Sequence, residues 1–203
     1  MSEKIEIMGI SVEKCYAEDI MESINQHWNE DTLATYGVIT MKLLIAAQKD
    51  EELKEYIETL DKAVADEPEI VKAAGLQDEA WESEISEHGF FGTLFWLLNL
   101  YKNRIFILGE KEEDTEKFCN YLREQYPDVV ILGKDSLTDM EADQTDRVIN
   151  EINSWNPQAV LSCSREYNVE RFVKRYRKMM NTKVWFSLGS SLPVFQETGI
   201  KSN

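Results

Sequence analysis

Residues Arg104–Tyr126 read RIFILGEKEEDTEKFCNYLREQY, and this stretch decides the fold class. An apolar run ends at Leu108, a tight turn with a single glycine follows, and a segment with a helical pattern then begins. This order is typical of a strand, a turn and a helix of the Rossmann-like kind. We therefore predict an α/β protein with a strand over Arg104–Leu108 and a helix over Asp114–Gln125.

The chain after this stretch repeats the same alternation. Further elements are predicted as strands at 129–132, 159–162 and 184–188 and as helices at 143–155 and 169–180. Strands that alternate with helices of about ten or more residues indicate right-handed βαβ units. The sequence therefore predicts a Rossmann-like, mostly parallel sheet flanked by helices.

The first half of the chain is less regular. Its predicted elements are strands at 4–8, 33–39 and 63–65 and helices at 17–28, 41–47, 50–60, 69–74 and 90–101. Residues 76–88 are the most polar and least periodic, so we predict a surface loop there. We expect one α/β domain over 1–203 that divides into an N-terminal lobe, 1–101, and a Rossmann-like lobe, 102–203.

Charge and composition exclude several classes of protein. The chain has 22 Lys and Arg against 38 Asp and Glu, a net charge of -16, so it should repel nucleic acid. Three cysteines and two histidines without regular spacing indicate neither a disulfide framework nor a metal site, and no cofactor is expected. The longest apolar stretch, Phe90–Leu98, is too short for a transmembrane segment. With no secretory leader pattern, a cytoplasmic location is predicted.

The turn after the first regular strand is where a parallel α/β sheet usually holds its ligand. Here it reads Gly109-Glu110-Lys111-Glu112-Glu113-Asp114, with one glycine and four carboxylates. Acidic residues in the first turn stabilise a helix through its dipole, whereas a phosphate needs glycines and exposed N–H groups. A self-capped helix is therefore favoured over a phosphate-binding turn.

Asp66 has two interpretations as a residue taken alone. It stands before Glu67-Pro68-Glu69, which is a natural helix start with proline near the first position. A helix cap is the commoner use of such an aspartate, and a general base is the alternative. His88, before Gly89, closes the predicted loop and is assigned no role.

A basic helix face stands out on this acidic chain. Its residues lie at i, i+3, i+4 and i+7 and are Arg171, Lys174, Arg175 and Lys178. Such a face is usually solvated. The functional alternative is contact with an acidic protein partner, a phosphate-bearing acceptor or the membrane surface.

Several segments together resemble a known family. The clearest is RIFILGEKEEDTEKFCNYLREQYPDVVILG, Arg104–Gly133, with its strand, glycine turn, helix, Tyr126-Pro127 and closing glycine. The others are MGISVEKCYAEDIMESI (8–24), AQKDEEL (47–53), VADEPEIVKAAG (64–75), RVINEINSWNPQAVL (147–161) and VWFSLGSS (184–191). In order and spacing, these segments resemble the WecG/TagA/CpsF family of glycosyltransferases over nearly the whole chain.

The resemblance implies a specific activity. Members of the family are inverting enzymes that transfer a hexose, often of the N-acetylmannosamine type, from a UDP-sugar to a polyprenyl-diphosphate-linked acceptor. Their products feed teichoic acid, capsule or related surface glycans of the cell wall. The resemblance also implies a protein peripheral at the inner face of the membrane. It places Asp66 at the catalytic base, and it places substrate-binding positions at Thr40, Gly109, Glu170, Gly189 and Ser190.

Other signature positions of the family have changed. The family's "T-x-N" falls on Val38 and Thr40, its second turn glycine is Glu110, its glutamine is Val169 and an aspartate is Pro193. The family's arginine-bearing C-terminal appendage has no counterpart before Asn203. The resemblance therefore leaves an alternative open: a catalytically degenerate member that serves as a binding or regulatory subunit. A third reading is a small-molecule-binding α/β domain unrelated to sugars.

Overall fold

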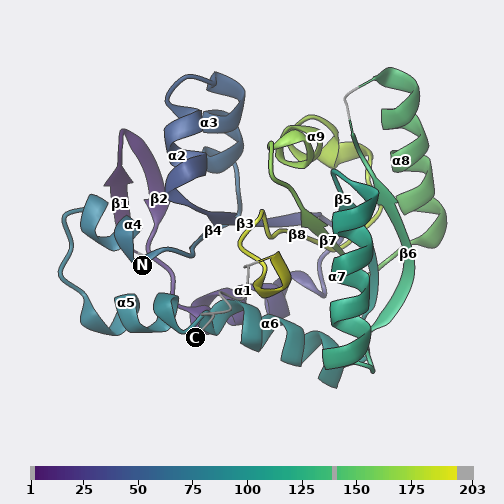
Figure 1. Ribbon diagram of the computed structural model, residues 1–203, viewed down its shortest axis with the longest axis horizontal. Helices are drawn as coiled ribbons and strands as arrows, with labels where there is room; N and C mark the ends of the chain where they lie inside the picture. The colour runs from purple at the N-terminus through teal and green to yellow at the C-terminus, as the bar shows by residue number, and fades with distance from the viewer. Residues whose placement is uncertain (1–2, 139–140, 196–203) are drawn as a thin grey trace, which may run out of the picture.

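The computed structural model describes residues 3–138 and 141–195, and its centre is a six-stranded parallel sheet (Figure 1). The strand order is β4-β3-β8-β7-β5-β6, and every neighbouring pair is parallel. The strands are β3 (Ala34–Ile39), β4 (Lys62–Ala65), β5 (Arg104–Gly109), β6 (Val130–Ser136), β7 (Ala159–Cys163) and β8 (Val184–Ser187). The predicted Rossmann-like α/β architecture is confirmed.

Helices cover both faces of the sheet (Figure 1). One face carries α2 (Met41–Ala47), α3 (Glu51–Glu58), α8 (Ala142–Trp155) and α9 (Asn168–Tyr176), which continues into the 3-10 turn η1 (Arg177–Met179). The other face carries α1 (Ala17–His27), α6 (Gly89–Leu100) and α7 (Glu112–Gln125). Because side chains alternate along a strand, Ile105 and Ile107 of β5 enter one core, whereas Phe106 and Leu108 enter the other.

Strands from both halves of the chain share this sheet. β3 and β4 come from the first half, and β3 pairs with β8, the last strand. The division into lobes at residues 101 and 102 stays a prediction. The first half also holds an antiparallel hairpin of β1 (Lys4–Ile7) and β2 (Ile10–Glu13), whose turn residues Met8 and Gly9 both have positive φ.

The connections of β5 and β7 leave in opposite directions. β5 leads through α7 to the outer strand β6, whereas β7 leads through α9 to β8 on its other side. The helices α7 and α9 lie on opposite faces. This is a topological switch point, where α/β proteins commonly bind ligands outside the carboxyl ends of the strands.

The prediction of a surface loop over residues 76–88 is wrong. Residues Glu79–Ser86 form the helix α5, which follows the short helix α4 (Pro68–Ala73). Asp78 caps α5 by accepting a hydrogen bond from the Trp81 backbone N–H at 3.0 Å. Trp81 and Ile85, one helical turn apart, are both buried. The sequence pattern does not indicate this helix, because many glutamates surround the capping residue and the apolar pair is too short to show a helical period.

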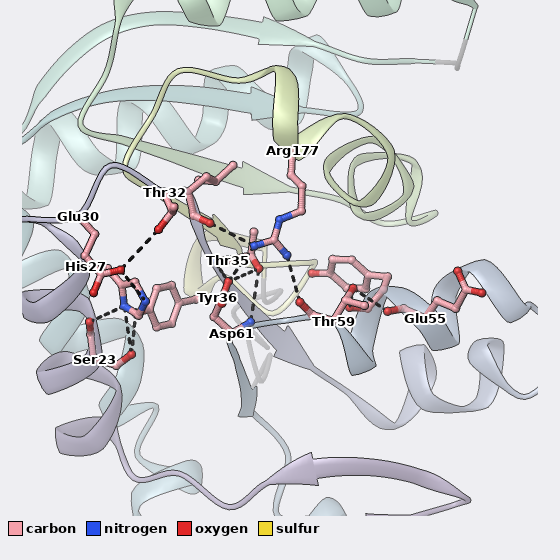
Figure 2. Close-up of polar contacts among 12 residues, drawn as sticks. Ser23, His27, Glu30, Thr32, Thr35, Tyr36, Glu55, Thr59, Asp61 and Arg177 are labelled. Carbon is pink, nitrogen blue, oxygen red and sulfur yellow. Dashed lines mark hydrogen bonds and ion pairs between the residues drawn. The ribbon is translucent and has the colours of Figure 1, made fainter.

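Figure 2 shows a polar network at the amino edge of the sheet, away from the carboxyl ends. Arg177, which follows α9, donates hydrogen bonds to the carbonyls of Leu33 and Thr59 and to the Asp61 carboxylate, each at 3.1 Å. The same carboxylate accepts from the backbone N–H and the hydroxyl of Thr35 at 2.7 and 2.9 Å. The network ties the end of α9 to the starts of β3 and β4.

Among the described helices, none has the length and apolar character that crossing a bilayer requires.

Candidate active site at the carboxyl edge of the sheet

Asp66 lies at the carboxyl end of β4 in contact with two distant parts of the chain. Its side chain is buried, with 9% of the residue exposed. Nδ1 of His88, the residue that precedes α6, lies 3.4 Å from Oδ1 of Asp66. Ser191, after β8, also forms a hydrogen bond with the Asp66 carboxylate. The fold therefore assembles a carboxylate, an imidazole and a hydroxyl from three separate segments.

This environment changes the proton affinity of Asp66. Burial raises the pKa of Asp66 above its usual value, because a buried carboxylate loses hydration. The Ser191 hydrogen bond and the charge of His88 act in the opposite direction and lower that pKa. A carboxylate with a raised pKa is a better proton acceptor, so Asp66 can act as a base toward a hydroxyl that reaches it. Asp66 and His88 also line a cavity of about 10 Å³, which offers room for about one water molecule.

The cap interpretation of Asp66 is wrong. The cap of α4 is Glu67, and Pro68 occupies the first helical position. Glu67 instead accepts a hydrogen bond from the Met41 backbone N–H at 2.6 Å, at the start of α2. Thr40 caps the same helix by accepting from the Leu43 N–H at 3.1 Å. The Thr40 hydroxyl oxygen thus accepts a hydrogen bond from α2, and its O–H can still donate to another group.

A second polar cluster lies at the carboxyl ends of β5 and β7. The Glu110 carboxylate accepts four hydrogen bonds there, and only 5% of the residue is exposed. Its donors are the Ser164 hydroxyl at 2.6 Å and the backbone N–H groups of Arg165, Glu166 and Asn168 at 2.7, 2.9 and 2.7 Å. The acidic first turn predicted for α7 is confirmed, since Glu112, Glu113 and Asp114 all lie in it, but among the described residues no side chain caps the helix by a hydrogen bond.

Glu170, in the first turn of α9, is buried beside this cluster. The residue is 3% exposed, and its Oε2 atom has no hydrogen-bond partner among the described residues. Burial raises the pKa of Glu170 to about 7; a hydrogen bond with Ser164 opposes the shift, and the negative charge of Glu110 adds to it. Glu170 therefore exchanges its proton near neutral pH, where an ordinary glutamate is fully ionised.

The segment after β8 connects the two clusters. Gly189 accepts a hydrogen bond from the Ser164 N–H at 3.2 Å, while Ser191 contacts Asp66. Gly189 has a φ of +60° and no atom within 4 Å of where a Cβ would lie, and Ser190 beside it is half-buried. Gly109, by contrast, is required by packing, because a Cβ there would meet Thr115 Oγ1 at 2.1 Å. No measured contact assigns a ligand to these positions, so their role in substrate binding stays a prediction.

Two features of the site escape sequence reasoning. His88 gives no signal beyond its position before a glycine, and its contact with Asp66 spans 22 residues. The Glu110 contacts span 54 to 58 residues, and the helix pattern after Gly109 points to α7 and not to the neighbouring loop. Both contacts depend on which strands lie side by side.

The basic face of α9 is paired within the chain. Three of its cations face the acidic helix α3, as Arg171–Asp50, Lys174–Glu55 and Arg175–Glu52. Because these carboxylates neutralise most of the face, the expected docking of a protein partner through Arg171, Lys174, Arg175 and Lys178 is not supported. These ion pairs instead hold α9 against α3.

Comparison with known proteins links the chain to one family and to named relatives. The model of the "Glycosyl transferase WecG/TagA/CpsF family" matches residues 5–199. Two relatives both carry the name N-acetylglucosaminyldiphosphoundecaprenol N-acetyl-beta-D-mannosaminyltransferase. The one from Bacillus subtilis (strain 168) is 23% identical over 176 residues, which cover 86% of this chain and 68% of the relative. The one from Staphylococcus aureus (strain MRSA252) is 20% identical over 194 residues, which cover 95% and 75%.

Proposed function

Because the chain belongs to the WecG/TagA/CpsF family of glycosyl transferases, we propose that it transfers a hexose of the N-acetylmannosamine type from a UDP-sugar to a polyprenyl-diphosphate-linked acceptor. The names of the two relatives support this choice of sugar and of a lipid-linked acceptor. The product would serve surface glycan synthesis, such as teichoic acid, and the lipid acceptor would bring the protein to the inner face of the membrane.

The observation that carries this proposal is the buried Asp66 carboxylate beside His88 and Ser191. In the proposed reaction, the acceptor hydroxyl oxygen attacks the anomeric carbon of the donor sugar while Asp66 takes the hydroxyl proton. The bond between that carbon and the β-phosphate oxygen breaks, and UDP leaves with the electron pair. The raised pKa of Asp66 suits a base that must accept this proton.

The other proposed contacts lie along the same edge of the sheet. Thr40 can donate its O–H to the substrate. Gly189, beside Ser190, has no atom within 4 Å of its Cβ position, which leaves room for a sugar or phosphate to approach. Glu170, beside Ser164 and Glu110, would supply a carboxyl group that is partly protonated at neutral pH. These substrate-binding roles rest on the family pattern together with the positions of the residues.

The test is a transfer assay with UDP-N-acetylmannosamine and an N-acetylglucosaminyl-diphosphate lipid acceptor. We expect turnover by the wild type and a loss of about 100-fold or more in Asp66→Asn, because general base catalysis contributes roughly that much. The matched control is Asp146→Asn, an exposed aspartate on α8, which should keep wild-type turnover. Equal turnover by Asp66→Asn and the wild type would remove Asp66 from the mechanism.

One observation favours the alternative of a catalytically degenerate binding or regulatory subunit. Glu110 fills a set of N–H donors at the switch point of the sheet, where a bound anion is otherwise expected. Calorimetric titration with UDP and several UDP-sugars separates the two functions. Absence of heat at millimolar ligand would support the degenerate subunit, and turnover that Asp66→Asn abolishes would exclude it.

A further inference from the structure

The Glu110 carboxylate forms its hydrogen bonds with a neighbouring loop and not with the helix α7 that follows it in the chain. Its carboxylate accepts one hydroxyl and three backbone N–H hydrogen bonds, all from residues 164–168 and all between 2.6 and 2.9 Å. Three N–H groups that converge on one carboxylate form the kind of cradle that proteins use for phosphate and other anions. The side chain of Glu110 therefore stands where an anionic ligand would fit.

The backbone conformation of residues 164–168 directs these N–H groups toward one point. Tyr167 adopts a left-handed conformation, with φ of 67°, which is uncommon for a residue with a side chain. Its N–H donates to Ser164 Oγ at 3.0 Å and holds the turn that aims the neighbouring N–H groups at Glu110. The loop ends at Asn168, the first residue of the nine-residue helix α9, whose dipole presents positive charge at this end.

A second, independent observation marks the same place as a ligand site. Glu170 is 3% exposed, and its Oε2 has no partner among the described residues, although a buried carboxyl oxygen normally has one. The Ser164 hydroxyl donates to Glu110, and Glu170 lies close enough to both residues for them to affect its pKa. Within the described part of the chain, one buried polar atom beside this loop is therefore left without a hydrogen-bond partner.

We propose that residues 164–168 form an oxyanion site that the chain keeps closed with its own Glu110 carboxylate, and that a phosphate or diphosphate group binds there once this carboxylate is removed. The class of ligand follows from the donors, since the three N–H groups can only donate and the Ser164 hydroxyl does donate. The Arg165 guanidinium lies at the same loop, but Asp114 pairs with it at 2.9 Å, so the backbone N–H groups and the Ser164 hydroxyl carry the site.

The wild-type protein excludes anions from this loop, because a second anion would meet the Glu110 charge at hydrogen-bonding distance. The inference goes beyond the proposed transfer reaction, because it concerns binding and needs no turnover. Failure of the oxyanion site would leave the Asp66 mechanism intact, and failure of the transfer assay would leave the oxyanion site to be tested by binding.

The experiment removes the carboxylate and supplies an anion in its place. Wild type, Glu110→Ala and Glu110→Gln are titrated with inorganic phosphate, with diphosphate and with UDP at matched ionic strength, by calorimetry and by amide NMR. We expect Glu110→Ala to bind diphosphate at least about 10-fold more tightly than the wild type. The amide signals of Arg165, Glu166 and Asn168 should shift on binding, and a lowered melting temperature should recover as the site saturates. Glu110→Gln, which keeps the side-chain volume but carries no charge, provides the answer if Glu110→Ala does not fold.

Glu112→Ala is the matched control, because Glu112 is an exposed acid on the same turn. It changes the net charge equally but leaves the cradle closed, so it should bind like the wild type. Tighter binding of UDP than of diphosphate would assign the site to a nucleotide, and equal binding would assign it to a phosphate group alone. The proposal is overturned if neither Glu110 variant binds more tightly than Glu112→Ala, or if the three amide signals do not move.

Discussion

Nδ1 of His88 lies 3.4 Å from Oδ1 of Asp66, and His88 holds this position with a left-handed backbone φ of 51°. A non-glycine residue in this conformation carries backbone strain, which surrounding contacts must offset. The imidazole and its charge lower the pKa of Asp66 against the larger effect of burial. His88 therefore tunes the proposed base and is a positioning residue in the proposed reaction.

Replacement of His88 by asparagine tests this tuning. Asparagine tolerates the left-handed conformation, but it cannot carry a positive charge. The pKa of Asp66 should rise further in His88→Asn, so the fall of kcat/KM toward low pH should begin at a higher pH than in the wild type. The measurement is the pH profile of the transfer assay.

The other histidine of the chain provides the control for this experiment. His27 lies at the amino edge of the sheet, where its Nδ1 is 3.0 Å from the Tyr36 hydroxyl (Figure 2). His27→Asn should leave the pH profile unchanged. An acid limb that does not move in His88→Asn would contradict the role of His88.

Glu170 should make the stability of the protein depend on pH. Its pKa is raised from 4.5 to about 7 in the folded state, so the folded protein holds this proton more tightly than the unfolded chain. The stability from this group is fully present below pH 4.5 and is lost as the pH rises through about 7. Glu170→Gln should therefore be more stable than the wild type at pH 8, by up to roughly 3 kcal/mol, and this gain should vanish near pH 4.5.

Urea denaturation at a series of pH values measures this difference. The exposed Glu124→Gln on α7 is the control, and its difference from the wild type should not follow the same pH course. A Glu170→Gln variant whose stability parallels that of the wild type at every pH would show that folding does not raise the pKa of Glu170.

Loss of Arg177 should destabilise the fold without changing the carboxyl edge. Arg177→Met removes the hydrogen bonds to Leu33, Thr59 and Asp61 that tie α9 to the starts of β3 and β4 (Figure 2). We expect a loss of about 1–3 kcal/mol, because polar groups that are partly buried lose their partner. The measurement is the free energy of unfolding in urea. Lys178→Met, the next residue, is the control and should change the stability by less than about 0.5 kcal/mol. Equal effects of the two substitutions would contradict the anchoring role of Arg177.

Gly109 should tolerate no side chain, and another glycine offers a direct comparison. A Cβ at Gly109 would lie 2.1 Å from Thr115 Oγ1, so Gly109→Ala must displace the start of α7 and should cost about 1–3 kcal/mol or more. At Gly92, inside α6, a Cβ would meet no atom within 4 Å, and Gly92→Ala should stabilise the helix by about 0.5–1 kcal/mol. Thermal unfolding of both variants gives the comparison. Opposite signs are expected, and a stabilising Gly109→Ala would refute the packing argument.

The regular elements of the fold follow from local sequence pattern. The apolar run of Arg104–Leu108 and the helical pattern of Asp114–Gln125 correctly predict β5 and α7, because their signals lie within one window of sequence. The sequence pattern does not predict the helix α5, because its cap, Asp78, and its buried pair, Trp81 and Ile85, lie among glutamates that obscure the helical period.

The candidate site follows from the sequence only in part. The family resemblance predicts Asp66 as the catalytic base, and this role stays a prediction; the structure places the residue at the carboxyl edge of the sheet, where α/β proteins commonly bind ligands. Sequence alone suggested a helix cap for Asp66, because proline at the first position of a helix is a local signal. Glu67 takes the cap position instead, one residue later.

The sequence by itself determined the α/β class, the parallel sheet and the family, since strand and helix periods and the order of segments are properties of the chain read along its length. Tertiary structure alone decided what each polar residue contacts. The order β4-β3-β8-β7-β5-β6 places β5 beside β7, so Glu110 reaches the N–H groups of residues 165–168, and it places β8 where Ser191 reaches Asp66. Hydrogen bonds depend on distance in space, and strand order sets that distance between residues far apart in the chain.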